Sequence, residues 1–472
     1  MAMPLGDILP EIAVLLTAVS IVLLASFLPR RLQWTGAPVA LAGLAIAAIF
    51  LFVQANSDAR TTFSATYALD MVSIEGRLLI LFVTAVTVLL SPRWFAADQR
   101  HGEYYAMLLF SALGAMVLAG ALDLLLVLIG VLLSSATGYV LAAYHRDWAL
   151  SVEAGMKYFL VGALANTALA LGATFMIGML GGPGFGEMEA VLATQKSSPL
   201  LLAGLGLVAI GMAYKIGAAP AHAWLPDVAE GAPAPSAAFL TVAPKIGAAI
   251  ALARLVSLFP ETGFAIRPLI ATLAVITMTL GNLAALWQDD LRRMLGWSSI
   301  SQAGYLLMAV TVAGLSDQAF PALIIFLAGY TAANLTAFAA VTDLRGRSDR
   351  SDYAGLAKSA PFAAIALTVA FLSLVGIPPL GGFVGKLELF LATIDGGYAW
   401  LAVAALFNTV LSLVYYLRFV APMIFREPAG VVHRLGSWSA VALWICLAAV
   451  LATGILAGLI LGPLMEVAVL PI

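Results

Sequence analysis

The chain has 472 residues, of which 62% are hydrophobic and only 10% are charged, with a net charge of -2 and a mean hydropathy of +1.03. Soluble domains carry about 25% charged residues, so this chain has too little polar surface to cover a globule of its length. The near-neutral charge gives no indication of nucleic-acid binding. We expect an all-α, polytopic membrane protein that contacts the lipid bilayer, because continuous apolar runs of about 20 residues fit helices and not the alternating strands of a barrel.

Fourteen apolar segments predict membrane-spanning helices. In chain order they cover about 8–27, 37–54, 71–90, 104–121, 124–144, 153–180, 200–220 with a broken continuation to 227, 236–259, 268–287, 294–315, 319–342, 361–394 with a break, 399–425 and 439–461. No basic stretch precedes the first segment, so we interpret it as a retained helix and not as a signal peptide. The single cysteine, Cys446, allows no internal disulfide and no thiolate metal site.

Basic residues in the connections indicate an orientation. Even-numbered connections hold only Arg60, Lys196 and Arg267. Cytoplasmic loops are enriched in Lys and Arg, so we expect the odd-numbered connections to face the cytoplasm and both termini to lie on the periplasmic side of a bacterial inner membrane. The odd-numbered connections hold Arg30, Arg31, Arg93, Arg100, Arg146, Arg292, Arg293, Arg345, Arg347, Arg350, Lys358, Arg426 and Arg434.

Prolines break two of the predicted spans. Pro220 interrupts the seventh span, and Pro378 with Pro379 interrupts the twelfth. Proline removes a backbone donor, and the freed carbonyls need partners inside a bundle or along a wet cavity. The breaks are five spans apart, and a five-span repeat must be inverted relative to its partner. We therefore predict helices 1–3 in residues 1–102, a first five-helix repeat in 103–260, a second, inverted repeat in 261–427 and a last helix in 428–472.

Four of the six lysines, Lys157, Lys215, Lys245 and Lys386, fall inside predicted spans. An ammonium at the centre of a membrane helix costs roughly 2.5–3.5 kcal/mol on insertion scales. Arginine stays charged in proteins, whereas a buried lysine can release its proton. The excess of lysine favours proton transfer through the membrane. In the alternative, the lysines pair with carboxylates, as the i, i+4 spacing of Glu153 and Lys157 allows, or donate to carbonyls that the prolines free.

The remaining candidates are polar residues near the first break and at span mouths. His222 is the one histidine at predicted membrane depth, and imidazole exchanges protons near neutral pH; a buried histidine bonded to a freed carbonyl is equally consistent. Asp227 and Glu230 end the broken seventh span, and Asp123 lies at the mouth of the fifth. These three carboxylates are either proton entries or simply solvated residues.

Several long motifs resemble a known family. They are the stretch from Pro220 to Lys245, which reads PAHAWLPDVAEGAPAPSAAFLTVAPK, together with Leu9-Pro-Glu11, 153–159, 293–305 and 376–386. They are similar to the antiporter-like membrane subunits of respiratory complex I, in the variant of subunit N of the bacterial NADH-quinone oxidoreductase. The resemblance implies fourteen helices with two inverted repeats, and a polar lysine axis that moves protons when quinone is reduced elsewhere in the complex. It places Lys157, Lys215, Lys245, Lys386 and His222 at family positions.

One residue departs from the family pattern. The family has a glutamate on the fifth span that pairs with the lysine on the seventh, and Leu132 occupies the aligned place here. Lys215 would then lack its counter-ion, so either another carboxylate substitutes for it or the chain is a divergent paralogue.

No phosphate loop, dinucleotide fingerprint, metal cluster or nucleophile elbow appears in the chain. We therefore expect no cofactor here, and expect NADH, FMN, iron-sulfur clusters and quinone on partner subunits, both membrane and peripheral.

Two alternative functions stay open. One is a subunit of a multisubunit cation/proton antiporter, against which the Ala-Pro-Lys245 form argues, and the other is the membrane arm of a hydrogenase-type complex.

Overall fold

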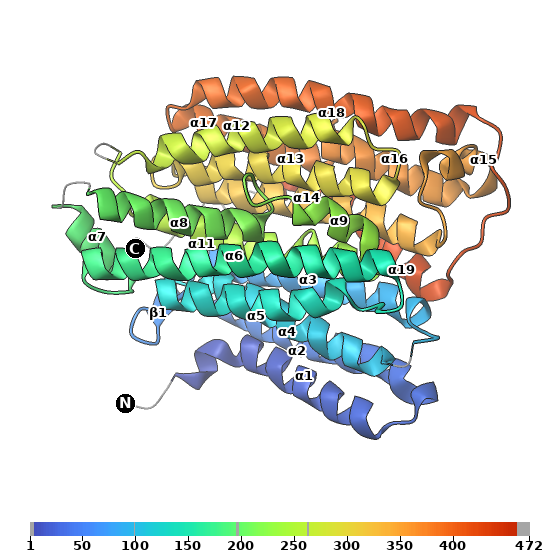
Figure 1. The fold of residues 1–472 in the computed structure, drawn as a ribbon, viewed down its shortest axis with the longest axis horizontal. Helices are drawn as coiled ribbons and strands as arrows, with labels where there is room; N and C mark the ends of the chain where they lie inside the picture. The colour runs from blue at the N-terminus through green and yellow to red at the C-terminus, as the bar shows by residue number, and fades with distance from the viewer. Residues whose placement is uncertain (1–3, 99, 195–197, 262–263, 460–472) are drawn as a thin grey trace.

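A computed structural model describes residues 4–98, 100–194, 198–261 and 264–459. The described residues are mostly helical, and their long helices run side by side (Figure 1). The α-helices are α1 Leu9–Phe27, α2 Gly36–Ala55, α3 Met71–Trp94, α4 His101–Gly120, α5 Leu124–Ala142, α6 Ala149–Leu180, α7 Phe185–Leu192, α8 Pro199–Ile216, α9 Trp224–Gly231, α10 Ala234–Leu240, α11 Ala243–Ser257, α12 Ile266–Ala285, α13 Leu291–Val312, α14 Ala319–Asp343, α15 Leu356–Ser359, α16 Pro361–Val375, α17 Gly381–Asp395, α18 Ala399–Phe425 and α19 Ser437–Ile455. Short 3-10 helices are η1 Leu5–Ile8, η2 Arg30–Thr35 and η3 Arg350–Tyr353, and strands β1 Arg60–Thr62 and β2 Tyr67–Leu69 form an antiparallel hairpin.

The fourteen predicted spans are confirmed as helical segments. Within the described residues, twelve segments are long and apolar enough to cross a membrane. The other two are α13, which is less apolar because it contains the run Ser298-Ser299-Ile300-Ser301-Gln302, and the broken pair α16–α17, each half of which is too short alone. The last predicted span ended at residue 461; α19 ends at Ile455, and residues 460 and 461 lie outside the described part of the chain.

Both predicted breaks are present. Gly217 ends α8 and Gly376 ends α16, each in the left-handed conformation with φ of 78° and 99°, which glycine adopts without the steric cost of a Cβ. A third break, between α10 and α11, was not predicted. It follows from Pro244 in the first turn of α11, which cannot donate a backbone hydrogen bond. The bounds of the two repeats stay a prediction.

The centre of the bundle is formed by α10–α11 and α14. The α10–α11 span is buried along its whole length, and α14 is nearly so. Close backbone approach makes this possible: a Cβ added at Gly247 of α11 would lie 2.2 Å from the carbonyl oxygen of Ala115 on α4. Lys245 therefore lies on one of the most enclosed segments of the molecule.

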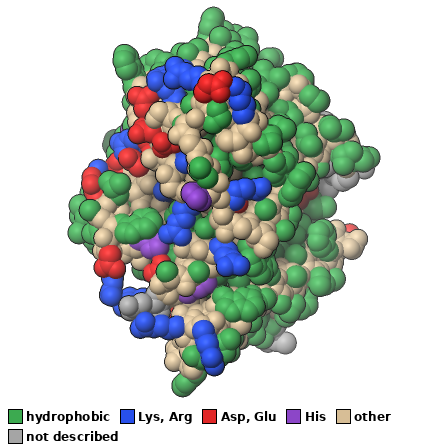
Figure 2. Space-filling view, turned by 90° about the vertical axis from the view of Figure 1, so that its right-hand side faces the viewer, with side chains coloured by type: hydrophobic (Ala, Val, Ile, Leu, Met, Phe, Trp, Pro, Cys, Tyr) green, Lys and Arg blue, Asp and Glu red, His purple; other side chains and the backbone are tan. Residues whose placement is uncertain are grey.

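The odd-numbered connections gather at one end of the bundle, which we call the arginine-rich end. Figure 2 looks onto this end and shows scattered blue and purple side chains over it. Several of these cations tie connections together: Arg345 covers the ring of Trp94 at 4.5 Å, and Arg434 reaches Asp343 over 2.7 Å. The side of the membrane that this end faces stays a prediction.

Candidate functional site

Lys215 lies in the last turn of α8, directly before the first break, and its side chain is buried. Its ammonium nitrogen donates to the hydroxyl of Ser135 on α5 over 3.1 Å. Leu132, three residues earlier on α5, is 45% exposed. Among the ion pairs of the described residues, none includes Lys215. Within that part of the chain no other carboxylate replaces the family glutamate, and the ammonium is bonded to a hydroxyl.

Lys245 is buried in the first turn of α11. It donates to the backbone carbonyl of Ser299 on α13 over 2.6 Å and to the hydroxyl of the same residue. That hydroxyl also bonds Tyr330 over 2.7 Å, and the Tyr330 ring centre lies 5.5 Å from the ammonium. A Cβ added at Gly217 would lie 3.7 Å from the Lys245 nitrogen. Lys245 therefore lies beside the first break, next to Gly217, the residue that ends the helix of Lys215.

Lys386 lies on α17, just beyond the second break, and is also buried. It donates to the carbonyls of Leu374 and Val375 over 3.0 and 2.9 Å. These are the last two residues of α16, whose terminal carbonyls lack intrahelical partners. The Tyr305 ring centre lies 4.3 Å from the ammonium. Lys386 thus donates to carbonyls that the helix break leaves free, which is the alternative to proton transfer given by the sequence. It makes this contact inside the bundle.

Helix α13 links the surroundings of Lys245 and Lys386. Gln302 donates to the Leu374 carbonyl over 3.1 Å, which is the same acceptor that Lys386 uses. Gln302 lies one turn beyond Ser299, the residue that holds Lys245. The hydroxyl and amide side chains of α13 therefore lie between the two lysines.

The sequence interpretation missed four of these partners, Ser299, Gln302, Tyr305 and Tyr330. A usable signal was present in the run Ser298-Ser299-Ile300-Ser301-Gln302. Buried hydroxyls and amides are costly unless they are hydrogen-bonded, so several within one apolar helix indicate polar contacts.

Lys157 does not join the three buried lysines. Its side chain is 44% exposed near the start of α6, at the arginine-rich end. It pairs with Glu153 over 2.7 Å, as the i, i+4 spacing predicted, and with Asp227 over 3.0 Å. Arg293 of α13 extends this group by pairing with Asp227 over 2.7 Å and with Glu230 over 2.6 Å. Four predicted site residues therefore form one partly exposed ion network, together with an arginine that the site prediction left out.

The other two candidates lie apart. His222 is half-buried between α8 and α9, 5.8 Å from the ring of Trp297, and its Nδ1 is buried without a hydrogen-bond partner among the described residues. The Asp123 carboxylate accepts from the amides of Leu125 and Leu126 over 2.7 and 3.0 Å. Asp123 is therefore the N-cap of α5, a structural task that satisfies two of the free amides at a helix start.

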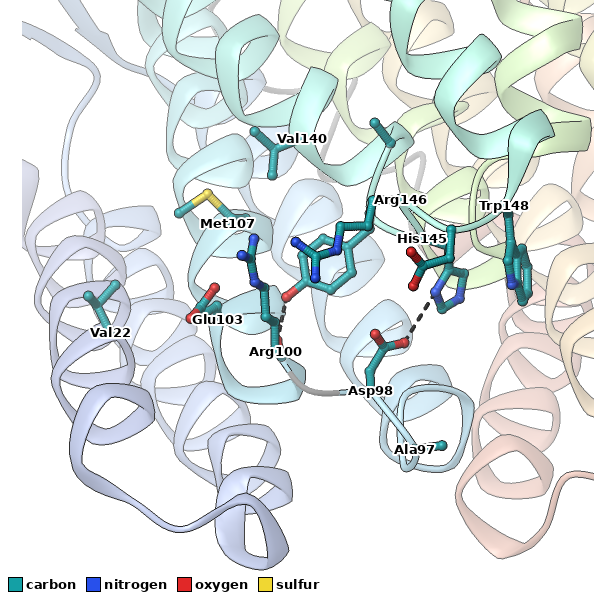
Figure 3. A pocket seen from close by; sticks show the side chains of 13 residues that line it. Val22, Ala97, Asp98, Arg100, Glu103, Met107, Val140, His145, Arg146 and Trp148 are labelled. Atoms are coloured by element: carbon teal, nitrogen blue, oxygen red, sulfur yellow. Dashed lines mark hydrogen bonds and ion pairs between the residues drawn. The ribbon is translucent and has the colours of Figure 1, made fainter.

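A cavity of about 640 Å³ lies at the arginine-rich end, and its lining does not include the three buried lysines. Figure 3 shows its lining side chains. His145 is at its wall, with Nδ1 3.2 Å from Asp98 and Nε2 accepting from the Trp94 indole over 3.1 Å. Burial lowers the pKa of His145 below its ordinary value, and the attraction of Asp98 offsets only part of this. His145 is therefore held as a neutral imidazole with its proton on Nδ1, because Nε2 accepts a hydrogen bond.

The family profile described as NADH:quinone oxidoreductase/Mrp antiporter, TM, matches residues 121–412. The chain is 42% identical over 448 residues to NADH-quinone oxidoreductase subunit N of a Mycobacterium species, with 93% of each chain covered. The chain belongs to this oxidoreductase and antiporter family. Within the family it is also 41% identical to a Streptomyces griseus NADH-quinone oxidoreductase subunit N, with 97% of each chain covered.

Two solved structures have the same fold as this chain. A chain of respiratory complex I from Thermus thermophilus aligns with a TM-score of 0.83 at 32% identity, covering 96% of this chain and 99% of that one. A chain of the Mrp complex from a Dietzia species also gives a TM-score of 0.83, but at 20% identity, covering 98% and 97%. The second likeness shows the shared fold alone, so the identities favour the oxidoreductase branch of the family.

Proposed function

We propose that this chain is a proton-translocating membrane subunit of an NADH-quinone oxidoreductase. The observation that carries the proposal is the set of three buried lysines, Lys215, Lys245 and Lys386, each at or beside a helix break and each bonded to neutral oxygen acceptors. Carbonyl and hydroxyl oxygens accept hydrogen bonds from an ammonium and from a neutral amine. The site can therefore hold either protonation state of each lysine, as a proton path requires.

The energy for pumping comes from partner subunits in this proposal. Moving one charge against 100 mV requires about 2.3 kcal/mol. NADH, FMN, iron-sulfur clusters and quinone would be bound by those partners, and this chain would be a non-redox part of the translocase. The complex would lie in a bacterial inner membrane, with both termini of the chain on the periplasmic side.

The proposed path runs along α13. Protons would pass between the surroundings of Lys245 and Lys386 through the side chains that lie between them, with Ser299 at one end and Gln302 at the other. The ion network of Lys157, Asp227 and Arg293 would connect the path to water at the arginine-rich end. His222, whose Nδ1 has no hydrogen-bond partner in the part of the chain that the structure describes, would be a relay beside the first break.

The second candidate is a subunit of a cation/proton antiporter, because the family profile that matches the chain describes Mrp antiporters as well as the oxidoreductase. Purification of the native complex separates the two. Co-purifying flavin and iron-sulfur subunits would support the oxidoreductase, whereas small hydrophobic antiporter subunits alone would contradict it.

The test of proton transfer is Lys245→Ala in the assembled complex. We expect NADH-driven acidification of inside-out vesicles to be abolished or sharply reduced, because the buried proton carrier beside the first break is removed. Lys358→Ala is the matched control, since Lys358 is an exposed lysine paired with exposed Glu427. Normal pumping by Lys245→Ala at normal assembly, measured on native gels, would contradict the proposal.

A further inference from the structure

A basic pocket lies at the arginine-rich end, where η2, the end of α3 and the start of α19 meet. Its volume is about 420 Å³, within the range of small-ligand sites. The described lining residues include no carboxylate. They are Arg30, Arg31, Trp34, Pro92, Arg93, Ala96, His101 and Trp438. The chemistry of this lining is that of an anion site flanked by indole rings.

Two of its arginines are available to a ligand. Arg31 and Arg93 are exposed, and neither side chain makes an ion pair or hydrogen bond among the described residues. Most other arginines at this end are engaged, as Arg293 is with two carboxylates and Arg434 is with Asp343. Guanidinium groups bind phosphate oxygens through two parallel hydrogen bonds, so this pair matches a phosphate group.

The pocket walls are fixed by contacts outside the pocket. Gln33, in the middle of η2, donates to the Ala25 carbonyl over 3.4 Å and accepts from the Gly102 amide over 3.2 Å. The Arg93 side chain runs past Gly436, the N-cap of α19, at 3.9 Å from its built Cβ position. Among the described residues, no side chain makes a capping hydrogen bond at this start of α19. The free amides and positive end of that helix dipole therefore add to the attraction for an anion.

The pocket continues into an apolar surface. Trp438, Val441 and Ile445 lie at i, i+3 and i+7 on α19, which is one helix face, and Val441 and Ile445 are 49% and 40% exposed. Trp34, which also lines the pocket, is 44% exposed. Tryptophan is enriched at membrane–water interfaces, where its ring meets both apolar chains and polar headgroups. A soluble phosphate would use the arginines but not this apolar face.

We propose that this pocket binds the phosphate of an anionic phospholipid. Arg31 and Arg93 hold the phosphate at the start of α19, Trp34 and Trp438 flank the glycerol region, and one acyl chain follows the Trp438–Ile445 face. The site is independent of the lysine path, and it would attach the first three helices and the last helix of the chain to the same lipid.

The experiment uses the purified, assembled complex and phosphatidylglycerol with a photoactivatable group next to its glycerol backbone. Cross-links are located by peptide mass spectrometry. We expect labelling at Trp34 and Trp438, and weak labelling by phosphatidylcholine that carries the same group. The Arg31→Gln/Arg93→Gln variant should lose labelling by about fivefold for each arginine removed. Arg31→Lys/Arg93→Lys should retain part of it.

Arg426→Gln is the matched control, because Arg426 is an exposed arginine at the same end and outside the pocket. Its labelling should equal that of the unchanged complex. Equal labelling by the two lipids, or unchanged labelling of the double glutamine variant, would overturn the proposal. Competition by millimolar inorganic phosphate would show a site for soluble phosphate and also overturn it. Absence of labelling would overturn it in favour of a pocket covered by a neighbouring subunit.

Discussion

At the scale of single residues, His145 carries a prediction about acid stability. Its pKa is lowered in the folded protein, mainly because the ring is buried, so the folded state binds fewer protons than the unfolded state below about pH 6.5. The contribution of His145 to the free energy of unfolding is therefore fully present above that pH. It is lost as the pH falls through the pKa that His145 has in the folded protein. Protonating Nε2 also breaks the hydrogen bond from Trp94.

We therefore expect the thermal midpoint of the complex to decrease as the pH is lowered from 7.5 to 5.5. The decrease should be smaller in His145→Gln, whose amide oxygen can accept the hydrogen bond from the Trp94 indole at every pH. His433→Gln is the control, because His433 is exposed. Equal pH slopes for the His145 variant and the unchanged protein, measured by differential scanning fluorimetry, would contradict this account.

The buried lysines could be predicted from the sequence, but their hydrogen-bond partners could not. Lys215, Lys245 and Lys386 could be selected from the sequence because a lysine in an apolar run is rare and costly. Their partners could not be selected, because they are backbone carbonyls and common hydroxyls contributed by other helices. The apolar run around Lys157 predicts a fourth buried lysine, but its side chain is partly exposed near the start of α6.

At the scale of elements, the break between α8 and α9 depends on Gly217. Alanine there would have to adopt a φ of 78°, and its Cβ would lie 2.4 Å from the Leu225 side chain and next to the Lys245 ammonium. We expect Gly217→Ala to lower the thermal midpoint and to impair proton pumping. A non-glycine residue in a sparsely populated conformation costs about 1–3 kcal/mol.

The control for this substitution lies on the same helix. A Cβ added at Gly206 of α8 meets nothing within 4 Å, and alanine is favoured over glycine inside a helix by about 1 kcal/mol. Gly206→Ala should therefore leave pumping unchanged and stability equal or higher. Equal losses in the two variants, by pumping assay and thermal scan, would show that the break tolerates a side chain.

The helices themselves were largely predictable. Runs of about 20 apolar residues located all fourteen spans, and prolines located the breaks in the seventh and twelfth. The break before α11 was missed, although Pro244 could have indicated it. The hairpin β1–β2 and the short helix α7 were missed because they lie in brief connections without a strong period.

At the scale of the whole molecule, a buried ion pair fastens the N-terminal helices to the centre. Asp70, the N-cap of α3, accepts from Arg254 of α11 over 2.7 and 2.9 Å, and both side chains are fully buried. Asp70→Asn keeps a capping oxygen but leaves the Arg254 charge without a partner. Removing one member of a buried pair costs about 3–5 kcal/mol.

We expect Asp70→Asn to reduce the yield and thermal midpoint of the assembled complex strongly. Asp7→Asn is the control, because the pair of Asp7 with Arg60 is partly exposed and such pairs contribute about 0–1 kcal/mol. Comparable stability of the two variants would show that the buried pair does not fasten these helices.

The orientation of the bundle is tested by cysteine labelling. The single native cysteine, Cys446, is buried, so background reaction should be low. Ser57→Cys lies in an even-numbered connection and Ala429→Cys in an odd-numbered one, and both positions are exposed. A membrane-impermeant maleimide should label Ser57→Cys in intact spheroplasts and Ala429→Cys in inside-out vesicles. The reverse pattern would invert the proposed topology.

The carbonyl acceptors of Lys386 have a consequence for how the site can change over time. Side-chain replacements at Leu374 and Val375 would leave both main-chain oxygens in place, so the ammonium would keep its hydrogen bonds through many substitutions. What must be inherited is the geometry that leaves those two oxygens unused, and that geometry resides in the glycine and prolines that follow. Substitutions are therefore tolerated at Leu374 and Val375, which contact the lysine through their main chain, and restricted at the glycine and prolines that form the break.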